Sequence, residues 1–455
     1  MDKSLWKSDK KAVALRSGEK DTIACTLNGE NINVKWTIDA NTVASVDKSG
    51  CVHGLSKGIT AVCAHHDGKK VLEIPVYVDR EVLPPLGTIP KPRFTLEDGV
   101  YVNPNSDAKT NTALLMFTGD VMCLSGQQKP AMKHGSFNFN ASFDYVKPIF
   151  EKADLVACNL ETMISQTATY KWEQSRVYAP KGLTTNCNAP ATFLDAVRYA
   201  GFDATMTATN HCLDTGIHGI KETIENLDRY NLLHTGIFDV PGDERYLLVD
   251  VNGIKIAMLS YVATSINSWE FELPKELLDV HVNMYSIEKV KSDVDSAKRK
   301  GAEFIVVFVH WGPNNTPVIN HGQHKKAQAL ADVGVDYVVG SHPHVIMNYS
   351  IVRAKDGRKV PVVYSMGNFL TSMDQVENKL NRDALILQLE LEKSQDGELL
   401  VKNGYIPCFI CKTFRKERFV VMPCNPEING GYTSENIEKS RARIKKAIGC
   451  EIAEI

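Results

Sequence analysis

A short, mostly apolar run at residues 335–339 ends in two histidines on alternate positions. The run reads Val-Asp-Tyr-Val-Val, and residues 340–344 read Gly-Ser-His-Pro-His. Such a run is typical of a buried strand in a parallel sheet, and ligands of open α/β sheets bind beyond the carboxyl ends of the strands. The pattern therefore predicts a site containing His342 and His344. By itself it also fits a polar loop with one buried, hydrogen-bonded histidine.

Polar residues follow five other predicted strands in the same way. The strands and the residues that follow them are 113–117 with Asp120, 155–158 with Glu161, 204–207 with Asn210 and His211, 304–309 with His310, and 362–364 with Asn368. Predicted helices at 143–152, 190–200, 217–230, 286–300 and 321–333 lie between them. This alternation predicts an α/β fold, and the repeated polar strand ends favour a shared functional site.

Length and charge limit the number of domains and the kinds of partner. A chain of 455 residues exceeds one ordinary domain, so two or three are expected. The formal net charge of −2 gives no overall field that would attract nucleic acid. The polar start at Met1 and the lack of a long apolar run predict neither a signal peptide nor a spanning helix. We expect either a cytosolic protein or the mature part of an exported one.

Changes of pattern along the chain predict four segments. They are 1–80, a small all-β unit; 81–110, a proline-rich linker; 111–375, the α/β domain; and 376–455, a β-rich extension with a final helix that packs on the α/β domain. In the first segment, the dipeptides Asn28-Gly29 and Asp67-Gly68 are typical of hairpin turns between short strands.

The cysteines indicate no zinc finger. Eleven is an odd number, so at least one is unpaired or pairs between chains. Cys25 and Cys63 fall on two central strands of the all-β unit, where a disulfide and two free buried thiols fit equally well. Cys408 and Cys411 have CxxC spacing, but their strand-like surroundings favour two packed thiols.

The residues at the strand ends form one candidate set of metal ligands. The set is Asp120, Glu161, Asn210, His211, His310, His342 and His344. Carboxylate, amide and imidazole donors without a thiolate suit Mn, Fe or Zn, and the set is larger than one ion needs. Two divalent metal ions roughly 3.5–4 Å apart would use them all and would lower the pKa of a bound water toward about 7.

His211 and Asp214 are the candidates for proton transfer. His211 stands next to Asn210 and is placed to protonate a leaving group, with a supporting role behind a ligand as the alternative. Asp214 follows three residues later and would fix the histidine tautomer by accepting a ring N–H. A helix entry is the other interpretation of this aspartate.

The motifs, in this order, resemble the calcineurin-like metallophosphoesterases, and in detail they resemble the poly-γ-glutamate capsule biosynthesis proteins of CapA type. The motifs are Gly119-Asp120-Val121-Met122, Asn159-Leu160-Glu161, Thr209-Asn210-His211 with Leu213-Asp214-x-Gly216, His310-Trp311-Gly312, His342-Pro343-His344, and Tyr364-Ser365-Met366-Gly367-Asn368-Phe369. The resemblance covers residues 112–372. Separately, Trp36 with residues 44–47 and 58–62 resembles the bacterial group 2 immunoglobulin-like module, which is common on exported and surface proteins.

The capsule-family resemblance implies a layered α-β-β-α sandwich with two facing sheets and a dinuclear site. The implied metal ligands are Asp120, Glu161, Asn210, His310, His342 and His344, with Glu161 bridging and His211 near the substrate. It implies a hydrolase that uses a metal-bound hydroxide on an anionic phosphoester or polyglutamate-type substrate. The work of such a protein would be surface-polymer synthesis, in a capsule-synthesis complex at the cell surface. The alternatives are a non-catalytic metal-binding scaffold and a general phosphatase or nucleotidase.

Two positions depart from the family pattern. Met122 stands where the phosphoesterase motif has a histidine, so one ion loses a ligand. Residues 313–316 read Pro-Asn-Asn-Thr where the branch has an acidic residue and an aromatic one, which removes a charge from the rim of the site.

Four further residues are candidates for substrate binding. Arg176 and Tyr178 would clamp an anionic substrate, with a solvated loop as the alternative. Trp311 is expected to form a wall of the pocket. Asn368 is expected to hold a loop beneath the site, within reach of the substrate.

Overall fold

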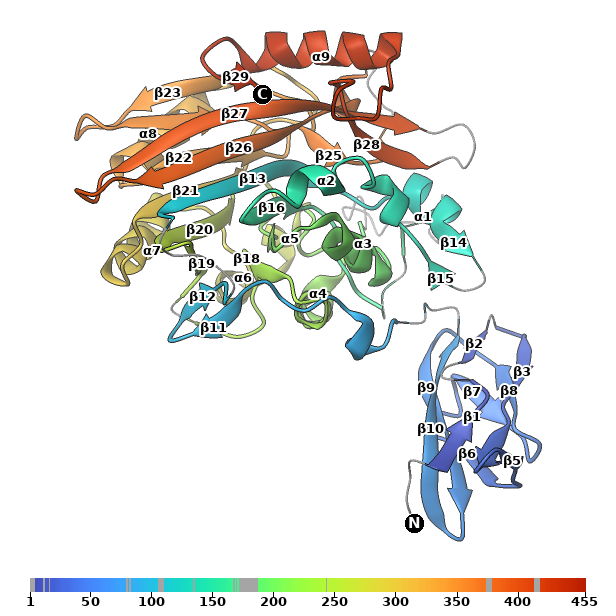
Figure 1. Cartoon of the computed structure of the whole chain (residues 1–455). Coiled ribbons are helices and arrows are strands. Elements are labelled where there is room, and N and C mark those ends of the chain that lie inside the picture. Colours follow the sequence, from blue (N-terminus) through green and yellow to red (C-terminus); the bar gives the residue numbers. More distant parts are fainter. Residues whose placement is uncertain are drawn as a thin grey trace. The chain divides into compact units, whose positions relative to one another are not determined.

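The computed structural model of the chain divides into two compact units (Figure 1). The first comprises Met1–Pro85 with Met132–Asn138, and the second comprises Leu86–Ala131 with Phe139–Ile455. The structure describes residues 5–10, 13–15, 17–78, 81, 83–104, 110–133, 136–166, 168, 170–171, 187–242, 244–373, 379–412 and 418–455.

The first unit is all-β, which confirms the prediction for this region. Its strands are β1 (Trp6–Ser8), β2 (Val13–Leu15), β3 (Lys20–Thr22), β4 (Cys25–Leu27), β5 (Glu30–Asn31), β6 (Lys35–Ile38), β7 (Ala44–Val46), β8 (Cys51–Gly54), β9 (Gly58–His66), β10 (Lys69–Val78), β14 (Met132–Lys133) and β15 (Ser136–Phe137). They pair in the orders β1-β4-β5, β2-β10-β9-β6, β3-β8-β7 and β14-β15. Asn28 and Asp67 adopt left-handed φ angles of 53° and 50° at their turns. Cys25 and Cys63 are free buried thiols. The immunoglobulin-like identity of the unit stays a prediction.

The second unit contains two large sheets. One has the order β18-β17-β16-β13-β26-β27-β28, with β25 beside β13 and β29 beside β27. Its strands are β13 (Thr112–Val121), β16 (Leu155–Leu160), β17 (Ala204–Met206), β18 (Leu233–Thr235), β25 (Asn368–Leu370), β26 (Asp383–Lys393), β27 (Leu399–Lys412), β28 (Phe419–Pro423) and β29 (Ala453–Glu454). The other has the order β11-β12-β19-β20-β21-β22-β24-β23. Its strands are β11 (Thr95–Glu97), β12 (Val100–Val102), β19 (Tyr246–Val251), β20 (Ile254–Val262), β21 (Phe304–His310), β22 (Tyr337–Ser341), β23 (Tyr349–Arg353) and β24 (Lys359–Val363).

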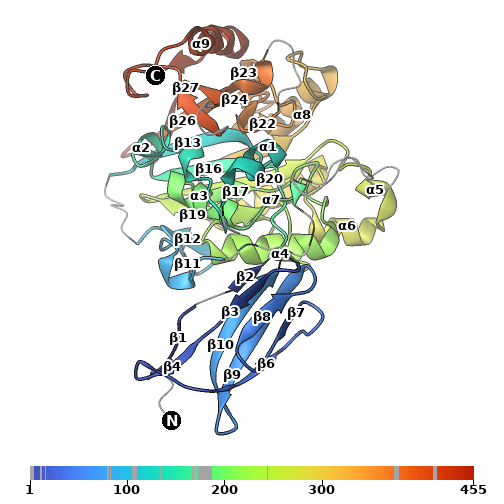
Figure 2. The same cartoon turned by 90° about the vertical axis from the view of Figure 1, so that its right-hand side faces the viewer.

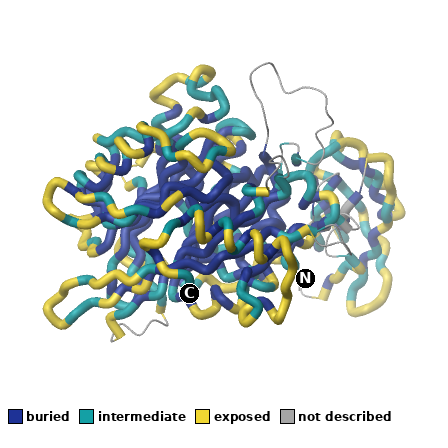
Figure 3. Tube along the Cα trace, turned by 90° about the horizontal axis from the view of Figure 1, so that it is seen from above, coloured by how far each residue is buried: buried dark blue, intermediate teal, exposed yellow. Residues whose placement is uncertain are grey.

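One apolar core joins the inner faces of these two sheets. Phe117 of β13 and Phe308 of β21 meet in it edge to face, with ring centroids 5.1 Å apart. The buried strands gather at the centre of the second unit, and exposed segments surround them (Figure 3). The strands can be so apolar because both faces of each sheet are covered.

Helices cover the outer faces of the two sheets (Figure 1). The helices of this unit are α1 (Ser125–Ala131), α2 (Lys147–Phe150), α3 (Thr192–Ala200), α4 (Gly216–Arg229), α5 (Trp269–Glu272), α6 (Lys275–His281), α7 (Ile287–Arg299), α8 (His321–Asp332) and α9 (Glu435–Ile448). Apolar residues of α7 and α8 pack on the outer face of the β20–β22 sheet, and α2 and α3 lie outside the other sheet. The helix α9 packs on β26 and β27 (Figure 2). The predicted layered α/β architecture is confirmed.

Two segments of the sandwich differ from their sequence-based interpretation. The stretch expected to be a linker contains β11 and β12, and β12 pairs in parallel with β19. The stretch expected to pack on the domain as an extension instead supplies β26, which pairs antiparallel with β13 inside the sheet. Both additions pair with strands far away in sequence, a relation that local patterns do not contain.

The parallel strands β13, β16, β21 and β22 bring their carboxyl ends to one edge of the sandwich. Gly119 permits a close approach there, because a Cβ atom on it would lie 2.0 Å from the carbonyl oxygen of Gly367. Gly340 is equally restricted, with the Tyr364 carbonyl oxygen 2.1 Å from such an atom. Within the described residues, the structure contains no helix long and apolar enough to cross a membrane.

Candidate metal centre

Six residues from the strand ends converge in one buried site. Asp120 lies near the end of β13, Glu161 directly follows β16, His310 ends β21, and His342 and His344 follow β22. Two groups of ligand atoms each lie within 4.8 Å of one another: Glu161 with His310 and His342, and Asp120 with Glu161 and His344. The sixth residue, Asn210, joins them through its Oδ1 atom, which lies 2.9 Å from His310 Nε2. The structure thus brings together all six residues predicted as ligands.

Glu161 lies between the two groups. Its side chain is fully buried, and neither carboxylate oxygen has a hydrogen-bond partner. The Oε1 atom lies 3.6 Å from His310 Nε2, 3.7 Å from His344 Nε2 and 3.8 Å from His211 Nε2. Although burial raises the pKa of this carboxyl, its interactions with the neighbouring His344 and His310 outweigh burial and hold the pKa far below the usual value. An isolated buried carboxylate is costly unless a cation compensates it, so the donor set around Glu161 fits a divalent metal ion.

Asp120 is held from both sides. Asn159 Nδ2 donates to its Oδ1 atom at 2.8 Å, and Oδ2 lies 3.2 Å from His344 Nδ1. Burial and the charge of Glu161 raise the pKa of Asp120. Burial alone would lower the pKa of His344, but Glu161 and Asp120 raise it to about 9. In the bare site, a protonated imidazole therefore supplies the positive charge that the two carboxylates require.

The loop after β22 carries its histidines in an unusual backbone conformation. His342 and His344 have φ angles of 94° and 58°, in the left-handed region that side-chain-bearing residues seldom adopt. His342 Nδ1 lies 3.1 Å from His310 Nε2, the atom that also faces Asn210. Burial and the neighbouring His310 lower the pKa of His342 well below its usual value. Strain of this kind gathers at functional sites, and here both strained residues are candidate ligands.

Beside this group, His211 and Asp214 form the expected pair. His211 Nδ1 lies 2.7 Å from Asp214 Oδ2, and Asn267 Nδ2 donates to Asp214 Oδ1 at 3.0 Å. Burial lowers the pKa of His211, but its interactions with Cys187 and Asp214 raise it well above its usual value. The Nε2 atom of His211 faces Glu161, so the ring is oriented toward the candidate metal centre.

The four predicted substrate-binding residues have different outcomes. Arg176 and Tyr178 lie outside the described residues. Trp311 does not form a pocket wall, because it is 1% exposed, packs in the core beneath α7 and α8, and donates from Nε1 to the Tyr364 carbonyl at 2.8 Å. Asn368 is also buried, and its Oδ1 atom lies 3.0 Å from His344 Nδ1. It therefore orients a candidate ligand and is not exposed to a substrate.

Sequence reasoning assigned no role to three residues that contact the site. Asn159 belongs to the Asn159-Leu160-Glu161 motif. It pairs with Asp120 in the register of β13 and β16, so knowledge of this strand pairing would have identified it. Ser341 Oγ lies 2.9 Å from His310 Nδ1, again at a strand end. Asn267 lies in a loop without a motif, so no signal in the sequence could have found it.

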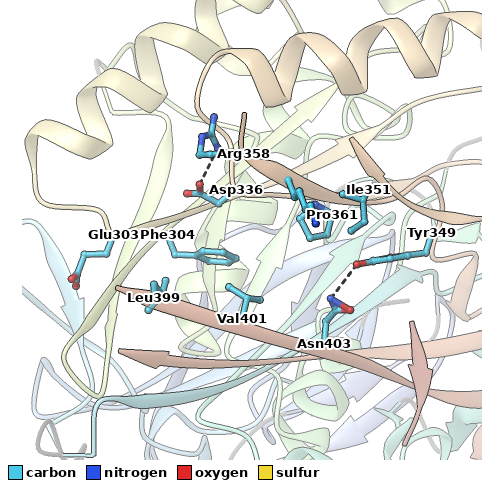
Figure 4. Close-up of a pocket in the computed structure, with 11 residues that line it drawn as sticks. Glu303, Phe304, Asp336, Tyr349, Ile351, Arg358, Pro361, Leu399, Val401 and Asn403 are labelled. Atoms are coloured by element: carbon cyan, nitrogen blue, oxygen red, sulfur yellow. Dashed lines mark hydrogen bonds and ion pairs between the residues drawn. The ribbon is translucent and has the colours of Figure 1, made fainter. Parts of the chain in front are cut away.

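A cavity lies at the amino ends of the strands, opposite the candidate ligands (Figure 4). This cavity of about 400 Å³ lies between β23, β24 and β27, with Phe304 and Tyr349 in its lining. Its polar groups satisfy one another: Arg358 pairs with Asp336, and Asn403 donates to Tyr349. The candidate ligands all lie at the other edge, and the chemistry is expected there.

Fold and site together define an α/β sandwich with a candidate metal centre at the carboxyl ends of its strands. Residues 114–373 match the model of the bacterial capsule synthesis protein family PGA_cap, and the chain belongs to this family. It is 28% identical over 326 residues to the PGA biosynthesis protein CapA of Bacillus subtilis strain 168, which covers 70% of this chain and 80% of that protein. It is 26% identical over 296 residues to the capsule biosynthesis protein CapA of Bacillus anthracis, which covers 64% of this chain and 66% of that protein. Among solved structures, the calcineurin-like phosphoesterase YfkN from Bacillus subtilis matches 73% of this chain and 97% of its own, with 16% identity and a TM-score of 0.39.

Proposed function

We propose that the chain is a metal-dependent hydrolase that acts on a phosphoester or a polyglutamate-type amide in the synthesis of a poly-γ-glutamate capsule or related surface polymer. The observation that carries the proposal is the buried Glu161 carboxylate, which has no hydrogen-bond partner and faces three imidazole nitrogens at 3.6–3.8 Å. A purely structural role would leave both oxygens of this buried carboxylate without a hydrogen bond, which is costly. Shared use of Glu161 by both ligand groups supports two divalent metal ions of the Mn, Fe or Zn class.

In this proposal, one ion would be held by Asp120, His344 and Glu161, and the other by Glu161, His310, His342 and Asn210. The ions would lower the pKa of a bound water and stabilise negative charge on the group under attack. Met122 lies two residues after Asp120, where the phosphoesterase motif has a histidine. The ion beside Asp120 would therefore lack one ligand and be the more weakly held of the two.

His211 acts as the proton donor. Its Nδ1–H donates to Asp214, and this contact leaves Nε2 as the atom that carries the proton toward the leaving group. Asn267 and the backbone N–H of Cys187 also donate to Asp214, at 3.0 and 2.6 Å, so the carboxylate is fixed. The pair is therefore oriented before substrate binds, which reduces the cost of positioning the acid.

The capsule role rests on the relatives. Both curated relatives are named as CapA proteins of capsule or PGA biosynthesis. The substrate would be an anionic polymer of this kind or an anionic phosphoester intermediate of its assembly. Metal ions bound by the candidate histidines and carboxylates would attract such an anion. A capsule-synthesis complex at the cell surface is the partner that this role would require.

Metal analysis combined with turnover tests the proposal. We expect between one and two equivalents of Mn, Fe or Zn in the purified chain, together with hydrolysis of an aryl phosphate or of poly-γ-glutamate. Glu161→Gln should remove the bridging charge and lower both metal content and turnover. Glu303→Gln is the matched control, because Glu303 lies beside the cavity at the opposite end of the strands and pairs with Lys393.

The two outcomes that contradict the proposal point to different alternatives. Bound metal without turnover of either substrate would favour the metal-binding scaffold. Turnover that Glu161→Gln leaves unchanged would place the reaction elsewhere in the chain.

A further inference from the structure

A thiol lies beside the candidate metal centre and has no role in the proposed hydrolysis. Cys187 is 2% exposed, and its Sγ atom lies 3.8 Å from Nε2 of His211. One ligand atom from each of Cys187, His211 and Asp214 lies within 4.8 Å of the others. A buried thiol beside an imidazole and a carboxylate is a combination that binds thiophilic metals.

Asp214 orients both of the other residues. Its Oδ2 atom accepts the backbone N–H of Cys187 at 2.6 Å and lies 2.7 Å from His211 Nδ1. Nδ1 faces Asp214, so when the ring is neutral its lone pair is on Nε2, which is the atom that faces the thiol. Histidines that bind metals usually donate their other N–H to a carboxylate in this manner.

The separation of the two donor atoms fits a shared tetrahedral ion. Zinc binds sulfur at about 2.3 Å and imidazole nitrogen at about 2.0–2.1 Å, so a tetrahedral ion places the two donors about 3.6 Å apart. The observed separation of Sγ and Nε2 is 3.8 Å.

We propose that Cys187 and His211, supported by Asp214, bind one thiophilic divalent cation of the Zn²⁺ class beside the candidate metal centre. Binding converts the thiol into a thiolate, and the proton passes to solvent. Water fills the remaining positions. The proposal concerns binding alone. A cation here would occupy the His211 Nε2 atom that donates the proton in the proposed hydrolysis, so the bound cation and that proton donation exclude each other.

Cobalt titration of the full chain tests this site, because Co²⁺ bound to a thiolate absorbs in the near ultraviolet and Co²⁺ bound only to oxygen and nitrogen does not. The chain is used with its exposed Cys450 changed to Ser. We expect a charge-transfer band that Cys187→Ala abolishes. Cys212→Ala is the matched control, because Cys212 is buried in an apolar cluster directly after His211 in sequence, and this variant should keep the band. Asp214→Asn should weaken Co²⁺ binding at the site by about 10–100-fold.

Three results would overturn the proposal: no band in the chain that retains Cys187, an undiminished band in Cys187→Ala, or equal losses in Cys187→Ala and Cys212→Ala. Circular dichroism establishes that each variant is folded. If Cys187→Ala does not fold, His211→Gln replaces it and should also abolish the band. Asp120→Asn, which alters the candidate metal centre alone, should leave the band in place, so failure of the proposed function and failure of this site give different results.

Discussion

One of the two oxygens of Asp120 is held by a neighbouring amide. Asn159 Nδ2 donates to Asp120 Oδ1 at 2.8 Å and lies 3.4 Å from His310 Nδ1, so it contacts two candidate ligands. Loss of such a partner typically costs 10–100-fold in metal affinity. We expect Asn159→Ala to weaken metal binding by about that factor, measured by competition with a chromophoric chelator. Asn403→Ala, in the distant cavity, is the control, and an equal loss in both variants would contradict a specific role for Asn159.

The charges of the site make the metal-free protein sensitive to pH. The pKa of His344 is raised from 6.5 to about 9, so its contribution to stability is complete below pH 6.5 and is lost as pH rises through 9. The pKa of Asp120 is also raised, so it contributes with the same sign. Metal binding, in contrast, strengthens as ligands lose protons. The difference in Tm between metal-loaded and chelator-treated protein should therefore grow from pH 6.5 to 9, measured by scanning calorimetry. A constant difference would show that these protons and the metal do not compete.

Most candidate ligands could be predicted because each follows a short apolar run directly. His310 ends such a run, and Asp120 and His342 lie within three residues of one. Their supporting residues could not be predicted to the same extent. Asn267 reaches Asp214 from a loop more than fifty positions away, and only the packed chain brings the two together. Trp311 was misplaced for a related reason, since its position next to His310 gave no information about which side of the sheet it faces.

At the level of elements, Arg93 attaches the segment before β11 to the sandwich. Its Nη2 atom donates to the carbonyl oxygens of Ala153 and Asp154 at 2.7 Å, and Nη1 lies 3.2 Å from Asp203 Oδ2. Asp203 is fully desolvated, so it needs its cationic partners. We expect Arg93→Ala to lower the free energy of unfolding by about 1–3 kcal/mol, measured by urea denaturation. Arg299→Ala, at an exposed position at the end of α7, should change it little, and equal effects would contradict the attachment.

Two parts of the fold were not predicted correctly, the β11–β12 hairpin and the position of β26, and both show that a local sequence pattern does not specify which strands pair. The hairpin of β11 and β12 turns at Asp98-Gly99, with φ angles of 49° and 81°, a signal present in the sequence but masked by the prolines before it. The strand β26 was recognised as a strand, yet its position beside β13 was not. Strand pairing over more than two hundred and fifty positions depends on loop closure and packing of the whole sheet, and the alternation within one strand does not encode its neighbour.

At the scale of the whole molecule, every candidate ligand belongs to the second unit. A chain that begins at residue 86 lacks the strands β1 to β10 but retains both large sheets. We expect it to bind divalent metal with an affinity within about twofold of the full chain, because the first unit supplies none of the candidate ligands. Isothermal titration of the two proteins measures this. A large loss of affinity would show that the first unit takes part in the site.

Removal of the last segment should have the opposite effect. A chain that ends at residue 375 lacks β26, which pairs with β13 along its length and contributes Leu385, Leu387 and Leu389 to the core between the sheets. The edge of β13 and this core would then face water, and an open apolar edge promotes aggregation. Since β13 also carries Asp120, the site cannot form correctly without the pairing. We expect this shortened chain to be insoluble or to lack cooperative unfolding, measured by sedimentation and calorimetry. A soluble, metal-binding product would show that the strands after residue 375 are an addition to a complete domain and not part of its sheet.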